Sequence, residues 1–170
     1  MRFFKTFVII SLLFLFNPSF AFSDGQIVYL DLDNIVSNTK AGKSIITNLE
    51  KSKKKALSKF EKKEKELKKI ESEINKQKNI ISEEELKKKL IEFRKEISLF
   101  KKERQKVIND FNKKKVEEFN NFFKKITPII QNYVSDKNIE MVLDRKNVFV
   151  ASKKKDITNE IIKLIDSKIK

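Results

Sequence analysis

The sequence predicts a mainly α-helical chain of the α+β class, in which a small strand-containing body carries a long antiparallel helical hairpin. Apolar residues recur with a period of 3.5 over two long segments, a pattern typical of coiled-coil seams. Short apolar segments rich in β-branched residues precede and follow those seams. The composition agrees, because 37% of the 170 residues are charged and the chain has only two glycines and two prolines.

The N-terminal segment, residues 1–21, is expected to be a cleaved secretory signal outside the fold. Its apolar run, residues 6–16, would span only about 16 Å as a helix, against about 30 Å for a bilayer core. Pro18 ends that run, and small residues follow at the positions that a signal peptidase recognises. We therefore expect export with cleavage after Ala21 or Ser23; the alternative is an uncleaved membrane anchor.

The first predicted element of the body is a buried strand over residues 26–31, which are short, apolar and partly β-branched. Asp33 or Asn34 is a suitable cap for a short helical turn that runs to Thr39. Gly42 is expected to mark a break before the next element.

Two coiled-coil seams follow, one on each helix of the predicted hairpin. The first extends from about residue 43 to residue 78, and the second starts near residue 86 and has one polar position, Arg104. The apolar residues of the first seam are Leu49, Ala56, Phe60, Leu67, Ile70, Ile74 and Ile81. Those of the second are Leu86, Leu90, Phe93, Ile97, Phe100, Val107 and Phe111.

A turn over residues 79–82 is predicted to join the two helices. Ser82 and Glu85 have the spacing of a capping box, and a run of three glutamates places negative charge at the N-terminal end of the second helix. The two helices should therefore fold back on each other as an arm of roughly 50 Å, at 1.5 Å per residue.

The second helix is expected to continue into the body with a shifted apolar stripe and a kink near Lys124, caused by Pro128. Phe122 and Phe123 diverge by about 100° on a helix, so one of them should face a subunit interface or a cavity. The predicted stripe consists of Val116, Phe119, Phe123, Ile126, Ile130 and Tyr133.

The chain is then expected to return to strands, over residues 139–143 and 148–151, joined by a four-residue hairpin loop, 144–147. Asp156 or Thr158 would cap a last amphipathic helix. Three short strands bury too little surface to anchor the arm alone, which favours an oligomer whose chains pool their strands. The residues expected to carry this assembly are Ile27, Tyr29, Val142, Val148 and Phe149.

The positive charge is concentrated in the arm. Residues 40–115 hold 26 Lys or Arg and 13 Asp or Glu, a net charge of 26 − 13 = +13. An arm with this field should attract polyanions or acidic chains in a salt-dependent way. The residues expected to form the field of the outer arm are Lys68, Lys69, Lys76, Lys87, Lys88, Lys89, Arg94 and Lys95.

Several classes of active site are excluded by composition. The chain has no Cys or His, which excludes thiol catalysis, imidazole catalysis and the usual zinc sites. Its two glycines lie far apart in the sequence, which excludes the glycine-rich loops that bind nucleotide phosphates. Asp31 and Asp33 begin like a calcium loop, but Ile35 and Val36 occupy the next ligand position and the required glycine position. We therefore expect no enzyme, no metal and no cofactor.

The order of these elements resembles the Skp/OmpH family of periplasmic chaperones. The matching residues are Ile27-Val28-Tyr29-Leu30-Asp31, Gly42-Lys43 ahead of Leu49-Glu50, Ile139-Glu140-Met141-Val142-Leu143-Asp144, and Asp156-Ile157-Thr158 before Ile161-Ile162. The resemblance implies a homotrimer with a barrel-like body formed by pooled strands, and three arms around a cavity. It further implies an ATP-independent holdase that binds unfolded outer-membrane proteins in the periplasm, and in some members an interaction with lipopolysaccharide.

The predicted elements divide the chain after the signal into a body, residues 22–42 and 116–170, and an arm, residues 43–115. Two other interpretations stay open. A structural coiled-coil protein that binds an anionic envelope surface, such as lipopolysaccharide, would have the same charged arm. A nucleic-acid-binding protein would require that residues 1–21 are not a secretory signal, because an exported chain rarely meets nucleic acid. No nucleic acid is therefore expected as a partner.

Overall fold

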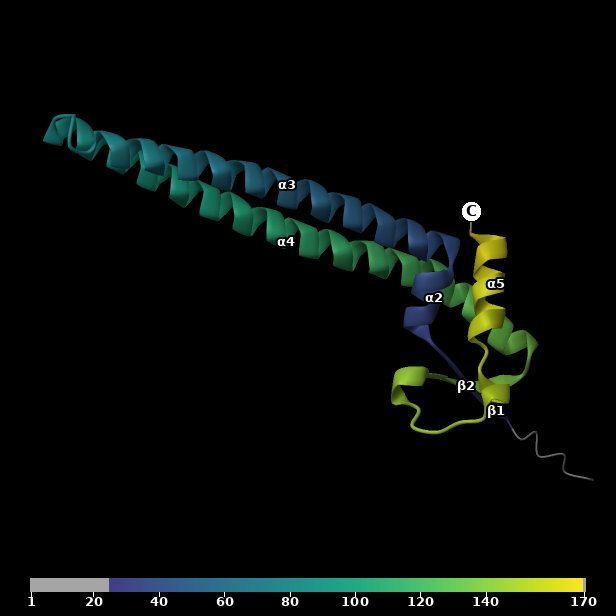
Figure 1. The fold of residues 1–170 in the computed structure, drawn as a ribbon. Helices are drawn as coiled ribbons and strands as arrows, with labels where there is room; N and C mark the ends of the chain where they lie inside the picture. The colour runs from purple at the N-terminus through teal and green to yellow at the C-terminus, as the bar shows by residue number, and fades with distance from the viewer. Residues whose placement is uncertain (1–24, 170) are drawn as a thin grey trace, which may run out of the picture.

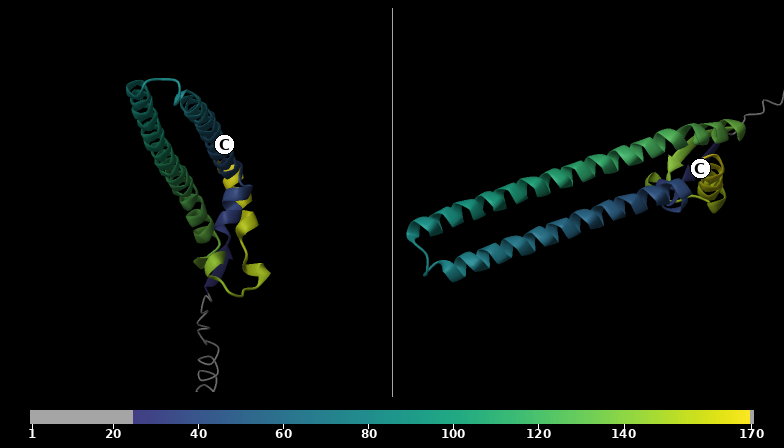
Figure 2. Two further views of the ribbon diagram at one scale, coloured as in Figure 1. Left: turned by 60° about the vertical axis from the view of Figure 1, so that its left-hand side comes forward. Right: turned by 90° about the horizontal axis from the view of Figure 1, so that it is seen from above.

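The chain folds into a small body and one long helical hairpin that projects from it (Figure 1). The computed structural model describes residues 25–169, so the predicted signal segment lies outside the described residues. Helix α3 (Lys40–Gln77) has 38 residues and helix α4 (Glu83–Asp136) has 54. The two run side by side and antiparallel along the arm (Figure 2). At 1.5 Å per residue, α3 is about 57 Å long.

The body consists of strands β1 (Gln26–Leu30) and β2 (Ile139–Asp144) with helices α2 (Leu32–Asn38) and α5 (Thr158–Lys168). The two strands pair in parallel, so the whole hairpin forms the crossover between them. The base of α4 packs into the same core. The most buried residues of this core are Val28, Leu30, Ile35, Phe122, Ile126, Ile129, Ile139, Ile157, Ile161 and Ile165. The predicted fold class is confirmed.

The helix boundaries near the body differ from those predicted. Asp31, rather than Asp33 or Asn34, caps α2, because its side chain accepts a hydrogen bond from the backbone N–H of Asn34. The break between α2 and α3 falls at Thr39, whose buried hydroxyl accepts from the N–H of Gly42. The predicted break at Gly42 is therefore wrong, and this glycine lies inside α3.

The start of the last helix also differs in part. Helix α5 begins at Thr158, and Ile157 at its N-cap position provides no side-chain hydrogen bond. The carboxylate of Asp156 accepts from the backbone N–H of Thr158 instead, so Asp156 supplies the capping contact that the sequence predicts.

The predicted hairpin at residues 139–151 is wrong. Strand β2 forms and pairs with β1, but Arg145–Asn147 is a turn of 3₁₀ helix and residues 148–152 form no strand. The N–H of Val148 bonds to the carbonyl of Arg145 and closes this turn, after which the chain runs on without pairing to β2. A second short turn, Lys153–Lys155, leads into α5.

The two seams of the arm are confirmed, since every predicted apolar position from Leu49 to Phe111 is buried or half-buried. The stripe near the body is wrong in part. Val116 is 58% exposed, whereas Phe122 and Ile129 are buried in the core of the body. Pro128 lies inside α4, which continues as one helix to Asp136.

Phe122 and Phe123 both pack on the core of the body, as an edge-to-face pair with ring centroids 5.6 Å apart. Phe122 also lines a hollow at the base of the arm together with Ala41, Ile45 and Ile169, so the expectation that one of the pair faces a cavity is confirmed for Phe122. Among residues 25–169, no helix has the length and apolar character needed to cross a membrane.

Candidate binding surfaces on the arm and the body

A buried aromatic cluster holds the two helices of the arm together near its middle. Phe60 and Leu67 of α3 and Phe100 of α4 are buried, and the rings of the two phenylalanines lie edge to face with centroids 6.1 Å apart. Such aromatic pairs contribute about 0.5–1.5 kcal/mol beyond their buried area. This cluster therefore fixes the register of the arm.

Arg104, the one polar residue of the second seam, protects this cluster. Its guanidinium carbon lies 5.8 Å from the centroid of the Phe60 ring, and its Nη1 lies 3.4 Å from Oε1 of Glu64. A cation over an aromatic face contributes about 0.5–1 kcal/mol at an exposed site. The arginine thus covers the edge of the seam instead of interrupting it.

Ion pairs across the helices reinforce the same register. Lys59 Nζ lies 2.5 Å from Oε1 of Glu103, and Lys63 Nζ lies 3.1 Å from Oε2 of Glu96. The hydrogen bond that Lys63 donates to Glu96 is the main cause that raises the pKa of Lys63, and the hydrogen bond that Lys59 donates to Glu103 is the main cause that lowers the pKa of Glu103. Lys59 and Glu103 are exposed and Lys63 and Glu96 are half-buried at the surface, so these pairs select which residues meet across the helices more than they add stability.

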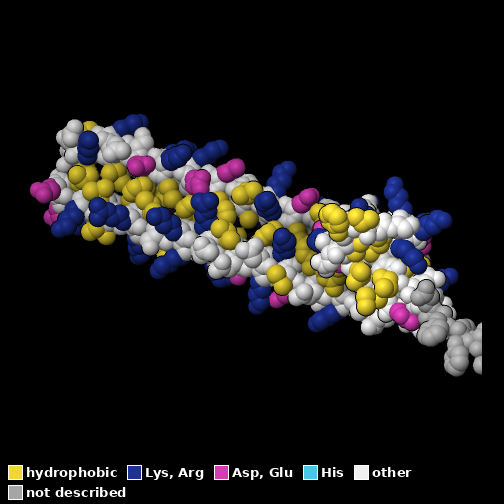
Figure 3. All heavy atoms as spheres, turned by 90° about the horizontal axis from the view of Figure 1, so that it is seen from below, with side chains coloured by type: hydrophobic (Ala, Val, Ile, Leu, Met, Phe, Trp, Pro, Cys, Tyr) yellow, Lys and Arg dark blue, Asp and Glu magenta, His cyan; other side chains and the backbone are white. Residues whose placement is uncertain are grey.

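The eight cationic residues predicted for the outer arm all lie on its distal half, and they do not converge on one pocket. Seven are exposed, while Lys89 is half-buried and donates to Oε1 of Gln77 at 2.5 Å. Lys88 is paired with Glu84 at 2.9 Å. Figure 3 shows blue side chains along both helices and hydrophobic side chains along the line between them. The arm is therefore a distributed positive surface.

The body exposes an apolar face formed by the outer side of the sheet and the segment that follows it. Phe149 is 102% exposed, and Val150 and Ile27 are also exposed. Two further residues on β2, Met141 and Leu143, belong to this face. Sequence reasoning missed these last two, although alternation along β2 from Val142 identifies both.

Three of the five residues predicted for assembly lie deeper than expected. Tyr29 is only 5% exposed, and it lines a hollow together with Val148 and Arg145. Val142 is half-buried because it packs on the core of the body, and Val148 is also half-buried. Ile27 and Phe149 are exposed. The start of β1 is therefore not the buried strand that the sequence predicts, and both side chains are available for the assembly, which stays a prediction.

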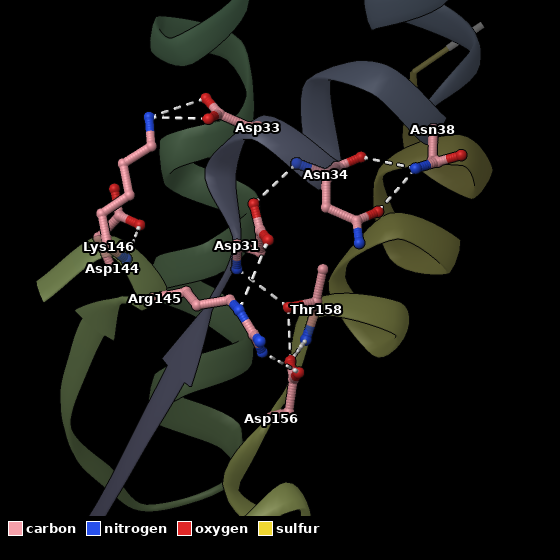
Figure 4. A network of polar contacts seen from close by, with 9 residues as sticks. All are labelled: Asp31, Asp33, Asn34, Asn38, Asp144, Arg145, Lys146, Asp156 and Thr158. Atoms are coloured by element: carbon pink, nitrogen blue, oxygen red, sulfur yellow. Dashed lines mark hydrogen bonds and ion pairs between the residues drawn. The ribbon is translucent and has the colours of Figure 1, made fainter. Parts of the chain in front are cut away.

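A polar network behind this face connects the ends of the segment that bears Phe149 (Figure 4). The N–H of Asp31 donates to Oγ1 of Thr158 at 3.0 Å, and that hydroxyl donates to Oδ1 of Asp156 at 2.5 Å. Arg145 lies between the two carboxylates, 4.0 Å from Asp31 and 3.9 Å from Asp156. The network joins β1, the end of β2 and α5.

This network uses its carboxylates as caps and ion-pair partners. Asp33 is paired with Lys146, with Oδ2 and Nζ 2.8 Å apart, and Asp144 accepts from the N–H of Lys146. In the part of the chain that the structure describes, no group of three or more acidic side chains is placed to hold a metal ion.

Comparisons with known proteins identify a matching protein family and a solved structure with a similar fold. A family model described as outer membrane protein (OmpH-like) matches residues 26–165. The crystal structure of an OmpH-like protein from Caulobacter crescentus CB15, to which an outer membrane chaperone role is attributed, superimposes with a TM-score of 0.78 at 14% identity. The match covers 85% of this chain and 86% of that one. No curated protein sequence matches this chain.

Proposed function

We propose, because this chain belongs to the OmpH-like family, that it is an ATP-independent holdase chaperone of the periplasm. Its clients would be unfolded outer-membrane proteins, which it would receive after export and keep from aggregating. Membership of the family supports a chaperone role in general terms, and the choice of client and compartment is our proposal. The chemistry of the protein would be reversible binding, without catalysis.

The observation that carries this proposal is the exposed arm. Measured along α3 from residue 43 to Gln77, the arm extends about 52 Å, and its two helices pack mainly on each other. Their excess of positive charge would raise the local concentration of acidic clients, and their apolar side chains would contact unpaired strands. Many weak contacts along one surface give avidity without a deep pocket.

We further propose that three chains assemble through the exposed apolar face of the body. Residues 22–42 and 116–170 would form the assembled body, and the arm, residues 43–115, would remain free to enclose a cavity. The outward side chains of β1 and β2 and the fully exposed Phe149 form an apolar surface of the kind that interfaces cover. Neighbouring chains would also satisfy the unpaired edge of β2.

The holdase proposal is tested by light scattering during refolding of an outer-membrane β-barrel protein. At one trimer per client, the protein should suppress aggregation. A scattering curve equal to that of the client alone would refute the chaperone role.

A matched pair of charge reversals tests the role of the arm. The arm variant changes Lys68, Lys69 and Lys76 to Glu, and the control changes Lys124, Lys163 and Lys168 of the body to Glu, away from the segment around Phe149. All six are exposed, so both variants alter the net charge equally. We expect the arm variant alone to lose most binding to lipopolysaccharide vesicles while retaining part of the holdase activity. Loss of vesicle binding with full holdase activity would instead favour a separate role at an anionic envelope surface.

The assembly is tested by the mass of the particle in solution. The mature protein should have three times the mass of its chain, and Phe149→Ser should shift it toward the monomer. A monomeric wild-type protein would contradict the proposed trimer.

A further inference from the structure

A shallow groove opens between the two helices of the arm, close to its tip. Its floor is apolar and consists of Ile70 and Ile74 from α3 and Phe93 from α4. Ile74 is 7% exposed, and the other two are half-buried. The seam is therefore incompletely covered at this point, and an apolar side chain of a partner would complete it.

The walls of the groove are polar. Glu73 and Gln77 come from α3, and Lys89, Glu92 and Glu96 come from α4. On each helix the lining residues follow the spacing i, i+3, i+4 and i+7, so each helix presents one continuous face to the groove. Three carboxylates and one ammonium give the lining a net charge of −2, against +13 for residues 40–115 as a whole.

Two hydrogen bonds between the helices mark the two ends of the groove. Toward the tip, Lys89 Nζ donates to Oε1 of Gln77 at 2.5 Å. Toward the body, Lys63 Nζ donates to Oε2 of Glu96 at 3.1 Å. Between them lie Glu73 and Glu92, and within residues 25–169 neither takes part in an ion pair or a side-chain hydrogen bond. Two carboxylates without partners thus flank an apolar floor.

We propose that this groove binds an extended client segment in which an apolar side chain lies two residues from a Lys or Arg. In an extended chain, residues i and i+2 point to the same side and lie about 6.6–6.8 Å apart. The groove spans seven residues of helix, about 10.5 Å, which is about the length of three extended residues. The apolar side chain would cover the floor while the cation lies between the two carboxylates.

This inference rests on the proposed chaperone function and names the class of client segment that the distal arm selects. The long-range field of the arm attracts acidic chains, whereas the groove favours a positive charge at short range. The two preferences act at different distances, so one client can satisfy both with different segments. Outer-arm attraction and groove selectivity are therefore separable by mutation.

The test uses two labelled synthetic peptides, one repeating Leu-Ser-Lys-Ser and the other repeating Leu-Ser-Glu-Ser, with binding followed by fluorescence anisotropy. The groove variant is Glu73→Gln with Glu92→Gln. The control is Glu61→Gln with Glu71→Gln, which removes the same charge from exposed positions of α3 outside the groove. All four changes are isosteric and lie on the surface, so the fold should be retained.

We expect the groove variant to bind the Lys peptide about three- to tenfold more weakly than the wild type, from two exposed charge contacts. The control should stay within about twofold, and the Glu peptide should not be weakened by either variant. Equal weakening by both variants would show that only net charge acts, and would overturn the proposal. No binding of the Lys peptide by wild-type protein that suppresses client aggregation would overturn it as well.

The two proposals fail in different ways. Wild-type protein that does not suppress client aggregation refutes the chaperone function itself. Wild-type protein that suppresses aggregation, with a groove variant indistinguishable from it toward both peptides, refutes only the groove.

Discussion

The substitution Gly42→Ala tests how closely α2 and α3 pack at the base of the arm. Gly42 is buried in the first turn of α3, against the end of α2. A Cβ atom added here would lie 2.0 Å from the carbonyl oxygen of Val36 and 2.9 Å from Oγ1 of Thr39. The nearest obstacle is backbone, so no side-chain rotation can relieve the overlap.

The expected effect is the balance of two opposing contributions. Replacing Gly by Ala in a helix usually stabilises it by about 1 kcal/mol. Overpacking of a well-packed site costs about 1–3 kcal/mol, and displacing α2 would also strain the 3.2 Å cap from Thr39 to the N–H of Gly42, worth about 1 kcal/mol. The overlap with backbone should outweigh the propensity, and we expect a net loss of about 1–3 kcal/mol.

Thermal unfolding followed by circular dichroism at one fixed protein concentration measures this loss. For a chain of this size, 1 kcal/mol corresponds to about 2–4 °C in Tm. Gly25→Ala is the matched control, because the atoms near its added Cβ belong to the exposed, flexible side chain of Glu140. The control should be near neutral. A Gly42→Ala protein as stable as the wild type, or more stable, would refute the packing argument.

Three further changes test the polar network, the half-buried phenol of Tyr133 and the arm. Thr158→Val removes a hydroxyl that both accepts and donates, and should lower the free energy of unfolding by about 1–3 kcal/mol in urea titrations. Burial, and to a lesser degree the charge of Glu160, raise the pKa of Tyr133. Above about pH 10 the phenol therefore loses its proton in the unfolded chain before it does so in the folded one, and the free energy of unfolding should fall as pH rises. Tyr133→Phe should flatten this decline in base titrations. Phe60→Ala should cost about 3–5 kcal/mol and increase hydrogen exchange in the middle of the arm, whereas Leu57→Ala, at an exposed site, should cost little.

The arm was predictable because its determinants are local. A seam of period 3.5 needs only the sequence of its own helix, and Ser82 caps α4 through the N–H of Glu85, three residues away. The cross-helix contacts were less accessible. The pairing of Arg104 with the Phe60 ring depends on the register of two helices, which neither seam specifies alone.

The body was harder to predict because its contacts join distant parts of the chain. Asp31 meets Thr158 across 127 positions, and the N–H of Lys40 is bonded by the carboxylate of Asp166 across 126. Glycine usually interrupts helices, so the sequence predicts a break at Gly42, whereas in the structure this glycine lets α2 approach α3 closely. Close approach between elements leaves no periodic signal in the sequence.

The error at residues 148–151 bears on assembly. Their composition favours a strand, yet they form none, although Arg145 and Asp156 hold the two ends of this segment against β1 and α5. The exposure of Phe149 is therefore not the result of a loose connection. Within one chain, this segment neither forms the strand that its composition favours nor buries Phe149. Such disagreement between local sequence preference and the fold is expected at functional sites. A neighbouring sheet edge would remove it, which is why we place the interface of the proposed trimer at this segment.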